Sequence, residues 1–73
     1  MNFQTLIKRK REALGLTLEE VGDAAGVSKS HLHGLENGKQ PNPGLYTCVR
    51  LSVALGLTLQ AMGAAILEQE SGQ

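Results

Sequence analysis

Cysteine and aromatic residues are scarce in this chain of 73 residues, and each scarcity excludes a type of fold. The single cysteine, Cys48, has no second cysteine to pair with, so the chain forms no internal disulfide and fits a reducing compartment. Phe3 and Tyr46 are the only aromatic residues, so the core must be built from aliphatic side chains. A chain this short forms one domain and buries only about 60% of its unfolded surface.

Membrane-spanning segments and an excess of charge are also missing. No apolar run approaches the roughly 20 residues that a transmembrane helix needs, and the first residues carry no long apolar segment or cleavage signal. We therefore expect a cytoplasmic protein with no membrane contact. The 7 basic and 7 acidic residues cancel, which weakens the case for nucleic-acid binding because phosphate binding depends largely on cations. Between residues 24 and 50, however, the sequence has three basic residues and only one acidic residue, Glu36, which permits a locally basic surface.

Two short helices separated by a tight turn are predicted in the stretch from Leu16 to Gly38. The first begins at a capping box. In it the Thr17 hydroxyl accepts from the N–H of residue 20, and the Glu20 carboxylate accepts from the N–H of residue 17. This helix is expected to span residues 18–25. It ends at Gly26, because glycine readily adopts the left-handed conformation that stops a helix.

Ser28 is the expected N-cap of the second helix, which runs from Lys29 to Asn37. Only three residues, Ala25 to Val27, connect the two helices, so the helices must cross steeply. A steep pair of this kind with an exposed second helix is typical of the helix-turn-helix of DNA-binding proteins.

The outward side of this second helix supplies the candidate base-reading residues. Leu32 and Leu35 face inward. The positions on the opposite side are Lys29, Ser30, His33, Gly34 and Asn37. The N-terminal half of such a helix can enter the major groove, where a lysine can donate to guanine. Asn37 and Lys39 are suited to phosphate contacts beside the groove, although the same polar pattern also fits an ordinary solvated helix surface.

Three further helices are expected around this pair. The first begins after an N-cap at Asn2 and runs to about Leu14. The fourth has Asn42 as its N-cap and Pro43 at its first position, and the fifth begins after Thr58. Helical spacing predicts which residues of the first and fourth helices are buried. They are Phe3, Leu6, Ile7, Ala13, Leu14, Leu45, Cys48, Leu51, Ser52 and Leu55.

Apolar residues outside these stripes indicate an interface between two copies of the chain. Tyr46, Val49 and Val53 are expected to be exposed on the fourth helix. Apolar residues also recur at helical spacing along the tail. The expected dimer contacts are Val53, Met62, Ile66 and Leu67. A less favoured alternative pairs residues 64–69 as a strand between subunits, and residues 70–73 are expected to be frayed.

The order and spacing of these motifs resemble those of the phage-repressor and Cro type of helix-turn-helix domain. The matching segments are Arg11, GLT at residues 15–17, EEV at 19–21, AGVS at 25–28, LENGK at 35–39, NPGL at 42–45 and LSVALGLTL at 51–59. The resemblance implies an all-α, compact five-helix fold of the lambda-repressor type over residues 3–62, with the helix-turn-helix at residues 18–37. Residues 63–73 then form a C-terminal extension.

The resemblance also implies roles for individual residues. The implied DNA-binding residues are Thr17, Lys29, Ser30, His33, Gly34, Asn37 and Lys39. Arg11 is implied to form a bidentate ion pair with Glu36, which would orient the first helix against the end of the third. Leu18 departs from the family, which commonly has a phosphate-binding glutamine there. Gly22 replaces the usual alanine and lets the two helices approach closely, and Gly34 offers no side chain to a base.

Two functions follow from these features. The first is a sequence-specific transcriptional regulator that binds double-stranded DNA as a dimer on a palindromic operator and represses by steric exclusion, in a bacterial or phage setting. The alternative is a protein-interaction module, such as the toxin-binding antitoxin of a toxin–antitoxin pair, which the zero net charge favours. No enzyme, metal site or cofactor is expected, because His31 and His33 diverge by about 200° on a helix and Cys48 lies in an apolar stripe.

Overall fold

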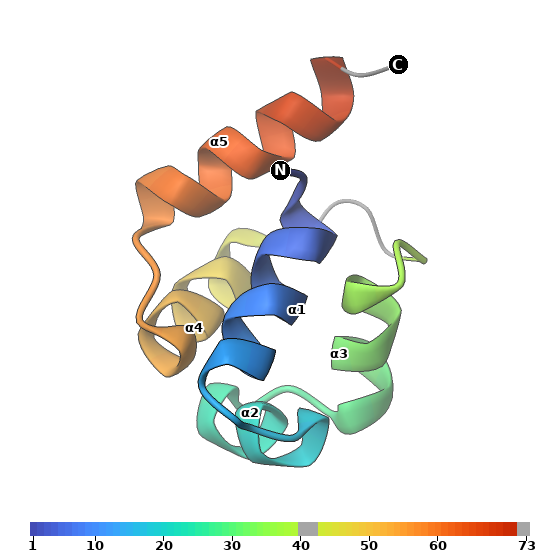
Figure 1. Cartoon of the computed structure of the whole chain (residues 1–73), viewed down its shortest axis with the longest axis vertical. Coiled ribbons are helices and arrows are strands. Elements are labelled where there is room, and N and C mark those ends of the chain that lie inside the picture. Colours follow the sequence, from blue (N-terminus) through green and yellow to red (C-terminus); the bar gives the residue numbers. More distant parts are fainter. Residues whose placement is uncertain (40–42, 72–73) are drawn as a thin grey trace.

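Five helices make up the part of the chain that this computed structural model describes, which is residues 1–39 and 43–71, with side chains up to residue 68. The helices are α1 (Phe3–Ala13), α2 (Leu18–Ala25), α3 (Lys29–Glu36), α4 (Leu45–Leu55) and α5 (Leu59–Ser71) (Figure 1). Within the described ranges the chain forms helices and turns without any strand, so the predicted all-α fold is confirmed.

Helix α1 lies at the centre of the arrangement. It packs against α3 on one side and against α4 and α5 on the other, and α2 packs against α4 and α3 (Figure 1). The start of the chain meets α5, where the Met1 amino group forms an exposed ion pair with the Glu68 carboxylate. Helix α3 lies on the side of α1 that is away from α5 (Figure 1).

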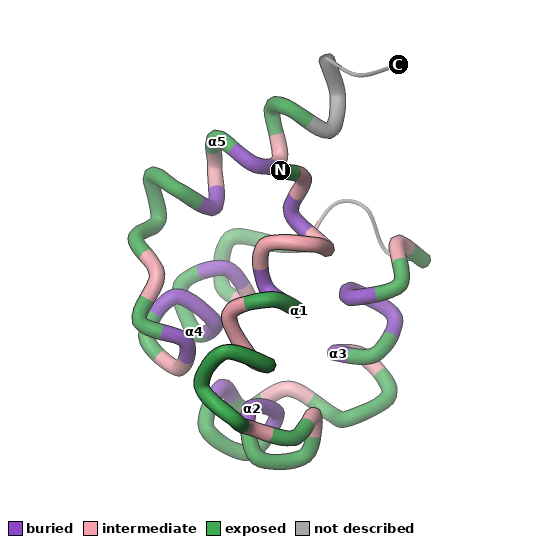
Figure 2. The backbone as a smooth tube through the Cα atoms, viewed as in Figure 1, coloured by how far each residue is buried: buried purple, intermediate pink, exposed green. Residues whose placement is uncertain are grey.

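All five helices contribute to one core. Buried positions lie on each of the five helices (Figure 2). The largest fully buried side chains are Phe3, Ile7, Val21, Leu32, Leu35, Leu51, Leu55 and Met62. Phe3 is the single aromatic residue among them, since Tyr46 is 72% exposed. The core is thus almost entirely aliphatic, as the composition predicts.

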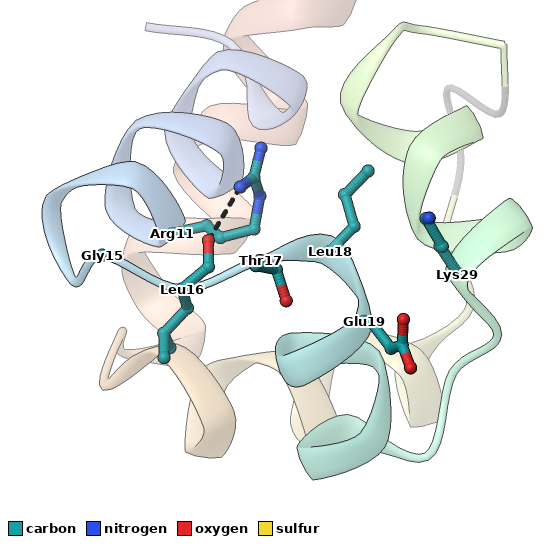
Figure 3. Close-up of a pocket in the computed structure, with 7 residues that line it drawn as sticks. All are labelled: Arg11, Gly15, Leu16, Thr17, Leu18, Glu19 and Lys29. Atoms are coloured by element: carbon teal, nitrogen blue, oxygen red, sulfur yellow. Dashed lines mark hydrogen bonds between the residues drawn. The ribbon is translucent and has the colours of Figure 1, made fainter.

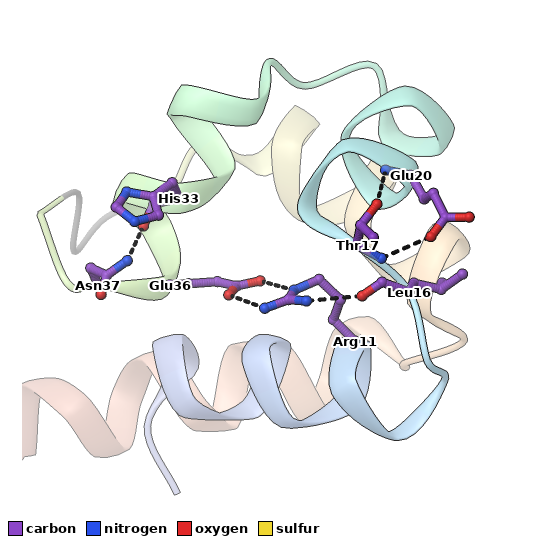
Figure 4. Close-up of polar contacts among 7 residues, drawn as sticks. All are labelled: Arg11, Leu16, Thr17, Glu20, His33, Glu36 and Asn37. Carbon is purple, nitrogen blue, oxygen red and sulfur yellow. Dashed lines mark hydrogen bonds and ion pairs between the residues drawn. The ribbon is translucent and has the colours of Figure 1, made fainter.

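Side chains cap four of the five helices, at the residues that the sequence predicts. Each accepts a hydrogen bond from the backbone N–H three residues later, at 2.9 Å for Asn2, 3.0 Å for Thr17, 3.1 Å for Ser28 and 3.0 Å for Thr58. The Glu20 carboxylate also accepts from the N–H of Thr17 at 2.9 Å, which completes the predicted capping box (Figure 4). These caps satisfy N–H groups that have no acceptor within the helix.

The start of α4 differs from the prediction. The helix begins at Leu45 after Gly44 as N-cap, so Pro43 precedes it, and Asn42 lies outside the described residues. Leu45 is 76% exposed although its spacing to Cys48 and the rest of the stripe predicts burial. Spacing places Leu45 on the apolar side of α4, but at the first turn of the helix the described part of the chain leaves most of this side chain uncovered.

Further corrections concern α1, α3 and the tail. Ala13 and Leu14 are exposed, whereas Lys10 and Arg11 in the last turn of α1 are half-buried. Helix α3 ends at Glu36, with Asn37 as its C-cap. The helix α5 runs to residue 71, so the alternative of a strand over residues 64–69 is wrong and residues 70–71 are helical. The frayed end expected at residues 72–73 lies outside the described residues.

The contact between α2 and the turn that follows it requires a residue without a side chain. Gly22 is buried, and a Cβ atom added to it would lie 2.6 Å from the carbonyl oxygen of Val27. This separation is below any van der Waals contact, and the close atom belongs to the backbone. The N–H of Val27 donates to the Gly22 carbonyl at 2.8 Å, so the backbone has little freedom to move aside.

We predict that Gly22→Ala lowers the free energy of unfolding by about 1 to 3 kcal/mol, because relief of the clash must displace backbone. The matched control is Gly63→Ala in α5, where an added Cβ has no neighbour within 4 Å. That change should raise stability by about 0.5 to 1 kcal/mol, since alanine loses less conformational entropy on folding. Urea unfolding followed by circular dichroism measures both, and equal midpoints for the two variants would contradict the packing described.

Candidate nucleic-acid interface

The outward side of α3 is open to solvent. Lys29, Ser30, His33 and Asn37 are exposed, whereas Leu32 and Leu35 on the inner side are fully buried. The two leucines anchor an eight-residue helix on the core and leave its polar side uncovered by other elements of the described chain. The amphipathic pattern of the sequence therefore corresponds to the two sides of α3 in the structure.

Gly34 is the exception on this helix. It is buried rather than exposed, so the expectation that it lies on the outward side is wrong. Its carbonyl oxygen accepts a hydrogen bond from the N–H of Lys39 at 2.9 Å, because the chain folds back over the end of α3.

The turn after α3 presents the predicted phosphate-binding residues. Gly38 has φ +75°, which reverses the chain and leaves Lys39 exposed. The Asn37 side-chain amide donates to the carbonyl oxygen of His33 at 2.7 Å (Figure 4). One amide hydrogen of Asn37 is therefore committed to the helix end, and the other remains free to donate to a phosphate.

A depression separates the start of α2 from the start of α3. Its volume is about 460 Å³, and its lining residues are Arg11, Gly15, Leu16, Thr17, Leu18, Glu19 and Lys29 (Figure 3). The capping box uses the N–H groups of residues 17 and 20. The N–H groups of Leu18 and Glu19, at the positive end of α2, have no acceptor within the helix. Together with Lys29 they suit an anion such as a phosphate, while the Glu19 carboxylate opposes it.

The sequence indicated only part of this depression. Lys29 and Thr17 were predicted as DNA-binding residues, but Gly15 and Leu16 were not assigned to a site. Their signal was their place in the loop immediately before the cap. A loop that precedes a helix N-terminus borders whatever the free N–H groups bind.

Arg11 and Glu36 join α1 to the end of α3 (Figure 4). The Arg11 Nε atom lies 2.7 Å from Glu36 Oε2, and Nη2 lies 3.0 Å from Oε1, so the pair is bidentate. The third nitrogen, Nη1, donates to the carbonyl oxygen of Leu16 at 2.8 Å. The hydrogen bond to Glu36 raises the pKa of Arg11. One guanidinium thus holds α1, the end of α3 and the loop before α2 in fixed relation.

We predict that Glu36→Gln lowers the free energy of unfolding by about 3 to 5 kcal/mol, because it leaves the Arg11 charge without its partner at a site where the arginine side chain is 14% exposed. The control is Glu68→Gln, which removes the same charge from an ion pair whose carboxylate is 59% exposed. That change should cost less than about 1 kcal/mol. Thermal unfolding compares the two, and similar losses would show that the buried pair does not hold the fold.

Other chemistries find little support in the described residues. No three of their His, Cys, Asp or Glu side chains come together as metal ligands. Cys48 is buried, and burial raises the pKa of its thiol, which disfavours the nucleophilic thiolate. None of the helices in the described ranges has the length and hydropathy to cross a membrane.

The fold and this exposed helix define the class of protein: an all-helical domain whose second and third helices form a helix-turn-helix. The chain belongs to a helix-turn-helix family, since the family model described as helix-turn-helix matches residues 7–62.

Its relatives are transcriptional regulators. An uncharacterised helix-turn-helix regulator of Methanothermobacter thermautotrophicus is 40% identical over 54 residues, which are 74% of this chain and 77% of that protein. The regulator SinR of Bacillus subtilis and of Bacillus licheniformis is 32% identical over 56 residues, which are 77% of this chain. The match spans 50% of the length of SinR. No solved structure matches significantly. The family and these relatives show a regulator type of domain and not an enzyme, and they do not favour the toxin-binding alternative.

Proposed function

We propose that the chain is a transcriptional regulator that binds double-stranded DNA in a sequence-specific way through α3. The observation that carries this proposal is the uncovered polar side of α3, which the rest of the described chain leaves free. The names of the relatives, all transcriptional regulators, support the same function. A helix anchored by two buried leucines and exposed along its other side has the geometry to enter a major groove.

The proposed contacts divide into two groups. Lys29 and Ser30 lie in the first turn of α3 and His33 lies one turn later. These three residues would contact base edges, where lysine donates to guanine and serine donates or accepts. Thr17 with the start of α2, Asn37 and Lys39 flank them and would contact phosphates. Gly34, being buried, would serve to let the turn approach α3 rather than to read a base.

The proposed dimer uses a groove between α4 and α5. The groove has a volume of about 300 Å³ and is lined by Pro43, Leu45, Cys48, Leu59, Met62, Gly63 and Ile66. Leu45 and Leu59 on its rim are 76% and 45% exposed, and Leu67 beside it is 64% exposed. Met62 is only 1% exposed, so it forms the floor of the groove and belongs to the monomer core; its expected role as a direct dimer contact is wrong. Val53, which is 79% exposed, stays a proposed contact.

A two-fold axis through this groove would present two copies of α3 to one face of a duplex. Half-sites would then lie about 34 Å apart, one helical turn, and the operator would be palindromic. Repression would be steric, because a dimer seated on such a site excludes polymerase from the same DNA. Selection of bound duplexes from a random pool tests the whole proposal, and a symmetric motif with this spacing is the expected result. Failure to retain any duplex at about 50 mM salt would overturn it.

We predict that alanine variants separate base contacts from phosphate contacts. Lys29→Ala should weaken binding to the selected duplex more than to a scrambled one, by about 1 to 3 kcal/mol. Lys39→Ala should weaken both duplexes alike and reduce the slope of log affinity against log salt by about 1. Fluorescence anisotropy over a salt series measures both. The control is Arg9→Ala, an exposed charge on α1, and wild-type behaviour of all three variants would show that α3 does not lie in the groove.

We predict that Leu45→Glu dissociates the dimer without unfolding the monomer. The new carboxylate would stand in the apolar groove of the interface, yet at the first position of α4 it interacts favourably with the helix dipole. The control is Gln60→Glu, which adds the same charge to the first turn of α5 at an exposed residue outside the lining of the groove. Analytical ultracentrifugation at tens of micromolar should give monomer for the first variant and dimer for the second. A wild-type protein that sediments as monomer would contradict the dimer.

A further inference from the structure

Arg50 of α4 reaches across to the turn between α2 and α3. Its Nε donates to the carbonyl oxygen of Ala25 at 2.9 Å, and its guanidinium lies 5.8 Å from the centre of the Tyr46 ring. We infer that Arg50 is a positioning residue for DNA recognition, which fixes this turn and thereby the direction of α3. The inference rests on the proposed function, because it assumes that α3 reads DNA.

The end of α2 has a specific need for this arginine. The last residue of α2 is Ala25, and the last carbonyl groups of a helix point outward as a partial negative charge. The last turn of α2 contains no basic residue that could compensate this charge. Arg50 supplies the missing cation from another helix and occupies the Ala25 carbonyl directly, which is a charge-assisted hydrogen bond.

The residue after Ala25 is a glycine, which leaves room for this contact. Gly26 has φ +68°, and a Cβ atom there would lie 2.9 Å from Nη2 of Arg50. On the opposite side of the turn, the N–H of Val27 donates to the carbonyl of Gly22 at 2.8 Å. The turn is therefore held from α4 by Arg50 and from α2 by Gly22.

The fixed turn leads directly into α3. The N-cap of α3, Ser28, follows Val27, so a rotation of the turn would swing the whole recognition helix. Arg50 contacts the turn that precedes α3, and it lies on α4 rather than among the proposed DNA contacts. Substitution of Arg50 should consequently loosen the placement of α3, while every residue proposed to contact a phosphate is still present.

The test compares three variants of the full chain: Arg50→Met, which keeps the stem but removes charge and donors; Arg50→Lys, which keeps the charge; and Arg9→Met as the matched control on the exposed side of α1. The first readout is hydrogen exchange at the Val27 amide. The second is anisotropy with the duplex selected from the random pool and with a scrambled duplex of equal length, each over a salt series. Circular dichroism selects the temperature at which all variants are folded.

For Arg50→Met we expect hydrogen exchange at the Val27 amide to be about tenfold faster and affinity for the selected duplex to be about tenfold lower. Each change corresponds to the loss of one charge-assisted hydrogen bond. Affinity for the scrambled duplex should change by less than about twofold and the salt slope should not change, since no phosphate contact is removed. Arg50→Lys should recover part of the selective affinity, and Arg9→Met should behave as wild type.

Two results would overturn the inference. Unchanged exchange at Val27 would show that Arg50 does not hold the turn. A loss of affinity for both duplexes with a salt slope lower by about 1 would show instead that Arg50 contacts a phosphate. A wild-type protein without sequence preference would overturn the proposed function, and the exchange result would then decide by itself whether Arg50 fixes the turn.

Discussion

The ion pair between Arg11 and Glu36 is the constraint on which the placement of α3 depends. Helix α3 has eight residues and only two large apolar anchors, Leu32 and Leu35, so hydrophobic contacts alone allow it to tilt. The bidentate pair, with oxygen–nitrogen distances of 2.7 and 3.0 Å, fixes the far end of α3 against α1. Because two charges must leave water to form it, such a pair adds orientation rather than net stability.

The same guanidinium couples the pair to the start of α2 through its hydrogen bond to Leu16. The depression that would receive a phosphate therefore shares one residue, Arg11, with the device that orients α3. Arg50 holds the opposite end of α3, at the turn after α2. Two arginines from two different helices thus restrain the two ends of α3, whose direction is not fixed by its own apolar contacts.

The features that the sequence predicts well are local ones. A cap is made by a side chain and an N–H three residues apart, so Thr17 and Ser28 identify their helix starts without knowledge of the rest of the fold. The two sides of α3 follow equally from the spacing of Leu32 and Leu35. The partner of Arg11, which lies 25 residues away in sequence, came from resemblance to a family and not from spacing.

The errors about burial share one cause, which is that periodicity identifies an apolar side of a helix but not what covers it. Leu45 lies on the apolar side of α4 and is exposed, while Met62 was assigned to an interface and is buried. Gly34 shows the same limit, because it is buried at the end of α3 where the chain turns back through the left-handed Gly38. The contact of Arg50 with Ala25 could not be predicted either, because it joins two residues that are 25 positions apart in the sequence.

The zero net charge acquires a different meaning once the charges are placed in the fold. The Glu36 carboxylate is neutralised by Arg11, Glu20 is engaged in the capping box, and Glu68 pairs with Met1. Lys29 and Lys39 lie exposed at the two ends of the outward side of α3, so this side has more basic residues than acidic ones. Two lysines still give a weak electrostatic contribution, since affinity for phosphate scales with the number of cations. A DNA-binding protein of this kind must gain its affinity from well-placed base contacts, and so it depends on the rigid orientation of α3 more than a strongly basic protein would.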